Sequence, residues 1–475
     1  MTRQIVLELE KDSEKPIFLN LASVIIREIE RGRLKPGAAL PGTRSLSRSL
    51  GIHRNTVDAA YQELAQQGWV VARPSQGTFV AQDLPDSYPV RSRERPPPAP
   101  VVAATRFNFV FSDGAPDARI SPRAELARAF RRALSAPAFL RGSSYGDPRG
   151  SITLRSALST YLGSERGVAA DPNDVITTRG SQMALFLAAR ALIRPGDTVA
   201  VEDPGYPMAW SAFRSAGANV SGVDVDEYGI SIERLASLAE KQPRLRAVYI
   251  TPHHQYPTTV ALSAPRRLAL LELVHRHNLL LFEDDYDHEF RFDGHPILPL
   301  AASTQSASVV YIGSLSKLLA PGLRLGYAVA SSKIVARMAS VREAIDRQGD
   351  VPLEHAVASL ILDGELRRHG RKSRQIYQAR RDLLAELLRK HFGDLAHFEL
   401  PTGGLALWLP LSKGASSDKW SASAAAVGLG VTPGSKFALR QRSTIDAFRL
   451  GYGNLSEDEL TRAVGMLARC RPQRR

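Results

Sequence analysis

The sequence is almost free of cysteine: Cys470 is the only one among 475 residues. An intramolecular disulfide is therefore excluded, and a reducing compartment is compatible with the composition. No apolar run approaches the ~20 residues that a membrane-spanning helix needs. Residues 1–10 carry charges and lack the apolar segment of a secretory signal. We therefore expect neither a membrane span nor a signal peptide. We expect a cytoplasmic protein.

Acidic residues are outnumbered, with 48 Asp and Glu against 62 Lys and Arg and a net charge of +14. Such a surplus favours anionic partners such as nucleic acid, although a solvated basic surface is equally compatible with it. The chain is too long for one ordinary domain, and at about 150 residues each it would hold two to four. An apolar fraction of 44% suffices for a sizeable core.

The first part of the chain shows helical spacing of apolar residues. Residues 16–32 have it, and Thr43 is placed to cap a second helix over residues 44–50. A third helix opens near His53. Two helices joined by a short glycine-containing turn predict a helix-turn-helix.

The start of the third predicted helix is polar. Arg54, Asn55 and Thr56 precede the first core position, Val57. The N-terminal end of a recognition helix enters the major groove, where arginine reads guanine, asparagine reads adenine and threonine holds phosphate. Two β-rich runs then flank a Pro-Ser-Gln-Gly turn within residues 68–80, which predicts a β-hairpin wing. A winged helix used only for protein contacts is the alternative.

This part resembles the GntR-type winged helix-turn-helix over residues 16–81. The resemblance rests on Gly-Arg-Leu-Lys-Pro-Gly at 32–37, Gly-Ile-His-Arg-Asn-Thr at 51–56 and Gly-Thr-Phe-Val at 77–80. It implies that residues 1–81 form a DNA-binding domain whose partner is double-stranded operator DNA. In that family the positions that match the following residues face DNA: Arg44, Arg54, Asn55, Thr56 and Gly77.

Residues 82–106 are rich in proline and lack a periodic apolar face, which predicts an extended linker. Residues 107–475 alternate short apolar runs with helical stretches such as residues 266–277, a pattern typical of parallel strands covered by helices on both faces. The expected strands are residues 175–178, 198–201, 247–251, 279–283, 309–312 and 326–330.

Lys317 is the centre of the chemical prediction. The strand at residues 309–312 is expected to be broken by the following Gly-Ser, which leaves Lys317 at a strand end, where open α/β sheets bind ligands. Taken alone it would be a surface lysine. However, Ser314 and Ser316 offer hydroxyls nearby, and Arg324 offers a charged fork that suits a phosphate dianion. A phosphate-bearing aldehyde held by a lysine indicates pyridoxal phosphate.

A second phosphate contact is expected at residues Gly180, Ser181 and Gln182. They stand between a strand and an apolar helix, so their N–H groups and the serine hydroxyl can meet a phosphate at the helix N-terminus. A plain helix cap is the alternative for this short motif.

Polar and aromatic residues supply the remaining cofactor candidates. Asp284 can pair with a pyridinium nitrogen and keep the ring an effective electron sink. Tyr286 can hydrogen-bond the ring hydroxyl, and Tyr206 can stack on the ring, although a packed loop aromatic fits Tyr206 as well. No histidine or cysteine lies at a matching ligand spacing, so we predict no metal site at residues 283–287.

Residues 107–469 resemble the fold-type I, aspartate-aminotransferase-like enzymes. Tyr-Gly-Asp-Pro-Arg-Gly at 145–150, Pro-Thr-Gly-Gly at 401–404 and the motifs above carry the resemblance. It implies an α/β domain with a large parallel or mixed sheet and a smaller C-terminal α+β subdomain from about residue 335. It also implies that Lys317 forms the Schiff base, that Ser314 with Arg324 holds the phosphate and that Arg449 grips a substrate carboxylate.

One motif departs from that family. Residues 253–259 are His-His-Gln-Tyr-Pro-Thr-Thr where most such enzymes have Asn-Pro-Thr-Gly. The ring-hydroxyl contact then falls to Tyr286 alone or to His254, Gln255 or Tyr256, and efficient transamination is left open. The same motif, and the order of the domains, resembles the MocR/GabR-type regulators.

The resemblance implies a transcriptional regulator that senses an amino acid or amine at Lys317. It also implies a homodimer, for which a head-to-tail, domain-swapped arrangement is one option. Two alternatives remain. One is an active class I/II aminotransferase with an accessory DNA-binding domain, and the other is an adaptor that uses neither DNA nor cofactor.

Overall fold

The computed structural model describes residues 16–85, 107–140, 145–294, 297–303, 308–393, 397–412, 414–440 and 445–472. The chain divides into two compact units, residues 1–104 and 105–475. Most of the predicted linker, residues 86–106, lies outside the described residues. Among the described residues no helix is long and apolar enough to cross a membrane.

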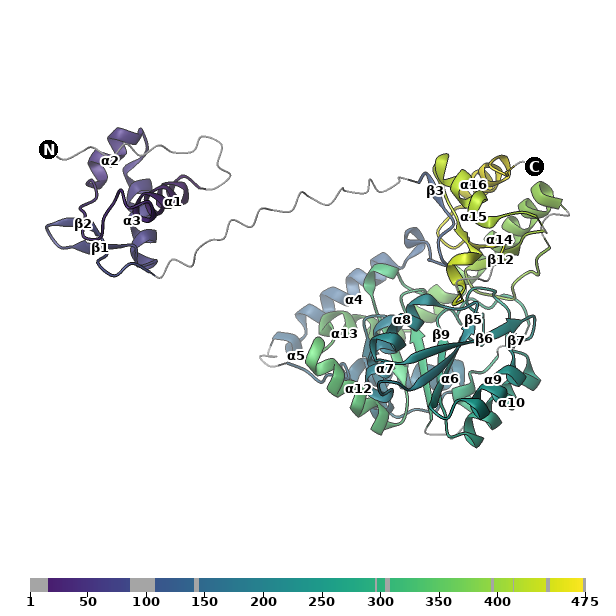
Figure 1. Cartoon of the computed structure of the whole chain (residues 1–475). Coiled ribbons are helices and arrows are strands. Elements are labelled where there is room, and N and C mark those ends of the chain that lie inside the picture. Colours follow the sequence, from purple (N-terminus) through teal and green to yellow (C-terminus); the bar gives the residue numbers. More distant parts are fainter. Residues whose placement is uncertain are drawn as a thin grey trace. The chain divides into compact units, whose positions relative to one another are not determined.

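The N-terminal unit is a winged helix-turn-helix. It contains α1 (Ile17–Glu30), α2 (Thr43–Leu50), α3 (Arg54–Gln66) and the antiparallel hairpin of β1 (Val70–Arg73) and β2 (Gly77–Val80) (Figure 1). Helix α2 begins one residue earlier than predicted: Gly42 is its N-cap and Thr43 is its first residue, so Thr43 does not cap it. Its small core gathers apolar side chains from all three helices and the wing, among them Leu21, Ile25, Leu46, Val57, Leu64 and Val80.

The second unit is built on an eight-stranded mixed sheet with the order β4-β11-β10-β9-β8-β5-β6-β7. Strands β4, β10, β9, β8, β5 and β6 run parallel, whereas β11 and β7 run antiparallel to their neighbours. The strands are β4 (Val175–Thr178), β5 (Thr198–Asp203), β6 (Asn219–Asp226), β7 (Gly229–Ile230), β8 (Leu245–Ile250), β9 (Leu280–Asp285), β10 (Val309–Ser314) and β11 (Gly326–Val329).

All six predicted strands are present, but two features of the sheet differ from the prediction. Strands β6 and β7 were not predicted, because β6 carries polar and glycine residues and is only partly buried. Strand β10 also continues through Gly313 and Ser314 instead of ending before them, because both residues pair with β11. Lys317 therefore lies three residues beyond the strand end.

Helices cover both faces of this sheet (Figure 1). Val199 and Val201 pack toward α7 and α8, whereas Ala200 between them packs toward α9 and α10. Alternate burial on both faces explains why these strands are continuous apolar runs. The covering helices are α4 (Arg123–Ser135), α5 (Pro137–Leu140), α6 (Ile152–Arg166), α7 (Ser181–Leu192), α8 (Pro207–Ser215), α9 (Ile232–Lys241), α10 (Ala264–Arg276), α11 (Leu300–Ser303), α12 (Ser332–Ile345) and α13 (Val351–Leu362).

The C-terminal part carries a three-stranded sheet with the order β12-β15-β14. The expected start of this part, near residue 335, falls inside α12, which packs against α7, and α13 packs against α4 and α6. Both helices thus stay with the large sheet. The elements after them are α14 (Glu365–Phe392), β12 (Ala406–Pro410), α15 (Ser417–Ala426), β13 (Leu429–Gly430), β14 (Thr432–Pro433), β15 (Ala447–Gly451) and α16 (Glu457–Arg469), and β13 pairs in parallel with β3 (Phe109–Val110).

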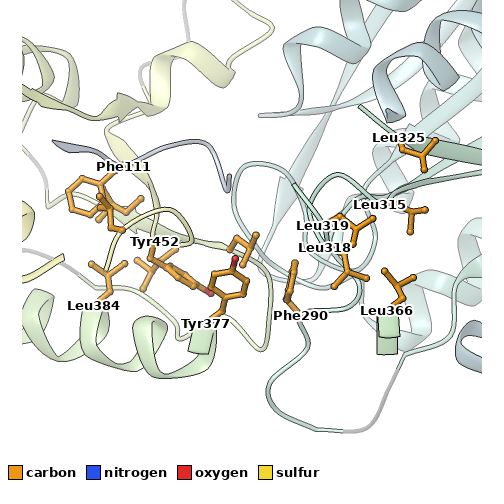
Figure 2. Close-up of a cluster of buried hydrophobic side chains, with 14 of the residues drawn as sticks. Phe111, Phe290, Leu315, Leu318, Leu319, Leu325, Leu366, Tyr377, Leu384 and Tyr452 are labelled. Atoms are coloured by element: carbon orange, nitrogen blue, oxygen red, sulfur yellow. The ribbon is translucent and has the colours of Figure 1, made fainter. Parts of the chain in front are cut away.

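A buried apolar cluster joins the large sheet to the C-terminal part (Figure 2). Leu315, Leu318 and Leu319, which flank Lys317, are at most 3% exposed and lie in it. Figure 2 shows them near Leu366, with Phe111 and Leu384 at the other end of the cluster. Burial of the neighbouring leucines fixes the loop that carries Lys317, which explains how a lysine after a strand end is held half-buried in one place.

Candidate functional site

A cavity lies where the carboxyl ends of the parallel strands meet, as expected for an open α/β sheet. Its lining comes from segments that are far apart in the sequence: Asp113, Ser181, Tyr206, Tyr249, Thr251, Tyr256, Asp284, Tyr286 and Lys317. Five of the nine were predicted as cofactor residues. The parallel arrangement brings them together because each strand delivers its C-terminal residues to the same edge of the sheet.

The Lys317 side chain is half-buried. Its Nζ donates to the carbonyl oxygen of Gly114 at 2.6 Å and lies 5.3 Å from the centre of the Tyr286 ring. Burial lowers the pKa of this amine, although nearby carboxylates such as Asp113 oppose the effect. A lysine whose pKa is lowered has a larger fraction of free amine and is a better nucleophile toward a carbonyl.

Two neighbouring carboxylates on β9 have opposite electrostatic settings, because successive strand residues point to opposite faces. Burial alone would raise the pKa of Asp285, but the Arg166 guanidinium 2.5 Å away lowers it well below its usual range. Asp285 also accepts a hydrogen bond from the Tyr311 hydroxyl at 2.7 Å. Asp285 is therefore an anion paired with Arg166, although its Oδ1 accepts no hydrogen bond within the described residues.

Asp284 faces the cavity, and no cation of the described residues lies at ion-pair distance from it. Its Oδ2 accepts a hydrogen bond from Tyr249 at 2.9 Å, while its Oδ1 is buried with no hydrogen-bond partner. Burial raises the pKa of Asp284 to about 7. An orphaned buried carboxylate oxygen that faces a cavity is suited to a protonated ring nitrogen, so the residues present fit a pyridine cofactor.

The phosphate side of the cavity is formed at the start of α7. Gly180 has a φ of +77°, and a side chain there would come within 3.4 Å of the Arg324 guanidinium. Ser181 begins the 12-residue helix α7 and lines the cavity. Arg324 donates to the carbonyl of Arg179 at 3.0 Å, which orients the guanidinium beside the helix N-terminus. A helix N-terminus and an arginine together favour an anion.

Of the predicted phosphate residues only Ser181 lines the cavity; the others, Gly180, Gln182, Ser314 and Arg324, do not. The Gln182 amide donates to the Met208 carbonyl at 3.0 Å. Ser314 is buried at the end of β10, opposite Gly326 of β11. Both residues lie next to residues of the site in the chain. Gln182 is in the first turn of α7, and Ser314 is the last residue of β10.

The sequence left open which of residues 254–256 contacts the cofactor, and the geometry favours Tyr256. His254 Nδ1 lies 2.7 Å from Asp287, and the Gln255 amide donates to the carbonyl of Pro204 at 2.9 Å, so both face away. Only Tyr256 of these three lines the cavity. Its ring lies 4.8 Å from that of Tyr206, edge to face. Tyr286, predicted for the ring hydroxyl, donates instead to the His254 carbonyl at 2.8 Å.

Arg449 of β15 lies beside this cavity and is buried. Its Nε donates to Asp113 at 2.7 Å and its Nη1 to the carbonyl of Pro257 at 2.7 Å. The guanidinium also stacks over Tyr256, 4.4 Å from the ring centre. The arginine predicted for a carboxylate is thus held by a carboxylate of its own chain.

The residues predicted to face DNA lie on the surface of the N-terminal unit. Arg44, Arg54, Asn55 and Gly77 are exposed and Thr56 is half-buried. Arg54 Nε lies 3.6 Å from the Asp58 carboxylate. Gly77 has a φ of +112°, a backbone that suits glycine at the tip of the wing.

Comparison with known proteins matches both units to families. Residues 19–80 match the gntR family of bacterial regulatory proteins, and residues 112–467 match aminotransferase class I and II. The probable rhizopine catabolism regulatory protein MocR of Rhizobium meliloti is 31% identical over 85% of this chain and 83% of its own. The chain belongs to the MocR-type regulators, which join these two domains.

Two further proteins extend the comparison of this MocR-type regulator. The pyridoxine biosynthesis regulator PdxR of Corynebacterium glutamicum is 30% identical over 97% of both chains. The kynurenine aminotransferase of Pyrococcus horikoshii, solved in complex with PMP, superposes with a TM-score of 0.71 at 28% identity over 76% of this chain and 90% of its own. Regulators of the gntR family bind operator DNA, and aminotransferase class I and II proteins depend on pyridoxal phosphate.

Three lining residues of the MocR-type regulator were missed by sequence reasoning: Asp113, Tyr249 and Thr251. Tyr249 lies inside an apolar strand, where a tyrosine is an ordinary core residue. Thr251 donates its hydroxyl to the buried Glu202 at 2.6 Å, a contact that no local pattern indicates. Asp113 lies in a short stretch after the predicted linker, and an acidic residue before a glycine was its only signal.

Proposed function

We propose that this regulator binds pyridoxal phosphate at Lys317 and uses it to sense an amino acid or amine, with DNA binding as its output. The half-buried Lys317 amine and the Asp284 carboxyl with its unpaired oxygen, in one cavity, are the observation that carries the proposal. Burial lowers the pKa of the Lys317 amine, which favours its free form, and leaves one oxygen of the Asp284 carboxyl unpaired toward the site of the ring.

Pyridoxal phosphate supplies an aldehyde that condenses with primary amines. Within the cavity, Asp284 would hold a proton on the ring nitrogen, and Tyr206 would pack against the ring. Ser181 and Arg324 would hold the phosphate, with the N–H groups at the start of α7 between them. The side chains of Gln182 and Ser314 lie outside the lining. These two residues would help only by holding the backbone next to the phosphate site in place.

The effector is an amino compound that replaces the Lys317 amine. Arg449 would bind its carboxylate. If the effector binds more tightly to one of two arrangements of the second unit, it would shift the population toward that arrangement and so change DNA binding. Arg44, Arg54, Asn55, Thr56 and Gly77 would contact the operator. We propose a homodimer, head-to-tail as in the resemblance above, whose two DNA-binding domains meet half-sites about 34–36 Å apart.

The decisive experiment is to trap the cofactor on its lysine. Full-length protein is incubated with pyridoxal phosphate, reduced with borohydride and mapped by peptide mass spectrometry. We expect the adduct on the peptide that contains Lys317, and none on that peptide in Lys317→Ala. Lys333→Ala, an exposed lysine on α12, is the matched control and should label like the wild type. Absence of the adduct from the Lys317 peptide would end the proposal.

A second measurement separates a sensor from an enzyme. Amino compounds are screened for a change in the absorption spectrum of the cofactor-loaded protein, and the active ones are tested for a change in operator affinity. A spectral change together with altered operator affinity supports sensing. Sustained amino transfer to a keto acid, with unaltered operator affinity, would instead assign the site to catalysis.

A further inference from the structure

The Arg449 guanidinium has little capacity left for a ligand. Its Nε donates to Asp113 Oδ1 and its Nη1 to the Pro257 carbonyl, both at 2.7 Å. Its Nη2 has only a long contact of 3.5 Å with the Tyr286 hydroxyl. A carboxylate that binds an arginine with two parallel hydrogen bonds needs two neighbouring nitrogens. The edge formed by Nε and Nη2 becomes available only if Asp113 moves away.

We propose that Asp113 is a built-in carboxylate that competes with the carboxylate of the effector for Arg449, and so determines how well the site distinguishes amino acids from plain amines. This inference rests on the proposed function and adds to it a residue that sets specificity. Asp113 does not take part in binding the amine. It acts through the guanidinium that it occupies.

The unequal burial of the two partners supports an exchangeable pair. The Arg449 side chain is 2% exposed, whereas that of Asp113 is 43% exposed. A buried cation needs a compensating anion, and in the absence of an effector Asp113 supplies it. Because the Asp113 carboxylate already reaches solvent, water can solvate it as soon as it leaves Arg449. An incoming carboxylate would keep the charge of Arg449 compensated.

The chain around Asp113 confines this movement to a short segment. Phe111 on one side is 1% exposed in the apolar cluster, where Figure 2 shows it at the same end as Leu384. Ser112 forms a β-bridge with Gly451 and donates its hydroxyl to Asn454 at 2.6 Å. Asp113 itself contacts the cavity through a hydrogen bond from the Tyr256 hydroxyl. The segment is thus anchored just before the carboxylate that would move.

Gly114, on the other side, links the two ligand-binding groups. Its φ is +65°, and a side chain there would come within 3.4 Å of Lys317 Nζ and 3.6 Å of Arg449 Nη2. Its carbonyl oxygen also accepts the hydrogen bond from Lys317. The dipeptide Asp113-Gly114 therefore hydrogen-bonds both the Lys317 amine, which the cofactor needs, and the Arg449 guanidinium, which the effector needs. Binding of the two ligands should displace it at both points.

The test uses three probes that separate the amine from the carboxylate: L-alanine, ethylamine and propionate. For the cofactor-loaded full-length protein, the concentration for a half-maximal spectral change is measured with L-alanine and with ethylamine. Asp113→Asn keeps a hydrogen-bond acceptor and removes the charge. We expect it to lower the L-alanine concentration roughly tenfold relative to ethylamine, because a charge-assisted hydrogen bond is about twice as strong as a neutral one.

Asp226→Asn is the matched control, since Asp226 pairs with Arg266 at 2.5 Å, is 42% exposed and lies outside the cavity. It should leave the ratio between the two probes unchanged. An unchanged ratio in Asp113→Asn would overturn the inference. If neither Asp113→Asn nor Asp113→Ala folds, Asp113 is a structural requirement and the inference is also overturned.

Hydrogen exchange of the peptide covering residues 107–117 tests the same contact without the amine chemistry. In cofactor-free protein, propionate should raise the amide exchange rate of this peptide in the wild type and in Asp226→Asn. In Asp113→Asn the same peptide should exchange fast even without propionate. Equal exchange in all three proteins, with and without propionate, would refute the competition. A failure of the proposed sensing looks different: L-alanine and ethylamine would leave the spectrum unchanged while propionate still acted on residues 107–117.

Discussion

Replacing Asp284 by asparagine should stabilise the cofactor-free protein, and more so as the pH rises. The Asp284 carboxyl is buried with no cationic partner in the described part of the chain, and burial raises its pKa from the usual 3.8 to about 7. The unfolded chain ionises this group freely above pH 4, whereas the folded chain resists ionisation up to about pH 7. Folded wild-type protein therefore loses stability as the pH rises through this window, and Asp284→Asn does not.

The size of the effect follows from the difference between the two pKa values. A difference of about three pH units at 1.36 kcal/mol each corresponds to roughly 4 kcal/mol once the pH exceeds 7. At pH 5 only about a third of this penalty is present, so the advantage of Asp284→Asn should grow by about 2–3 kcal/mol between pH 5 and pH 8. Asparagine can still accept the hydrogen bond from Tyr249, so packing should change little.

Urea unfolding at pH 5 and pH 8 measures this difference, with fluorescence from Trp210, Trp408 and Trp420 of the second unit as the signal. Asp226→Asn is a control of opposite sign, because the Arg266 hydrogen bond lowers the pKa of Asp226. That variant should be less stable than the wild type at neutral pH. Asp284→Asn with the wild-type pH dependence would show that Asp284 has a partner in solution and would remove the argument for a ring nitrogen.

Three further variants test other parts of the molecule. Arg54→Ala should weaken operator binding by about 1–3 kcal/mol in a gel-shift titration while the cofactor spectrum stays unchanged, whereas Arg31→Ala, exposed on the same domain, should have a smaller effect. Leu64→Ala, at a fully buried position of α3, should destabilise the N-terminal unit by about 2–5 kcal/mol and abolish operator binding, with cofactor binding retained in spectra. Gly180→Ala should cost about 1–2 kcal/mol in thermal unfolding and weaken cofactor binding, because the φ of +77° disfavours a side chain that would also press on Arg324.

The elements of this protein were predictable where one local pattern dominates. Helices α1 and α3 follow from apolar spacing, and Gly32, at a φ of +70°, follows the end of the first. Strand β4 was predicted with the observed bounds, since a buried parallel strand is a short apolar run. Strand β6 was missed, because its polar and glycine residues are tolerated next to the short edge strand β7 and leave little apolar signal.

The cofactor residues were predictable to the extent that each lies at the end of a predicted strand. Ser181, Asp284 and Lys317 all follow or end apolar runs, and parallel strands bring such ends to one edge. The partner of a buried polar atom is a different question, because it depends on segments distant in the sequence. Nothing near Asp284 or Asp285 shows that one pairs with Arg166 and the other with no cation.

By itself, the sequence determined the order of the domains, the types of most elements and the residues able to carry the chemistry, since these depend on periodicity, glycine and proline positions and side-chain type. Only the tertiary structure decided which of those residues meet. The Asp113–Arg449 pair joins residues 336 positions apart. Lys317 reaches the cavity because leucines around it pack against elements from elsewhere in the chain. Burial and pairing are properties of the packed chain, so their effects on pKa and on ligand access become visible only in the fold.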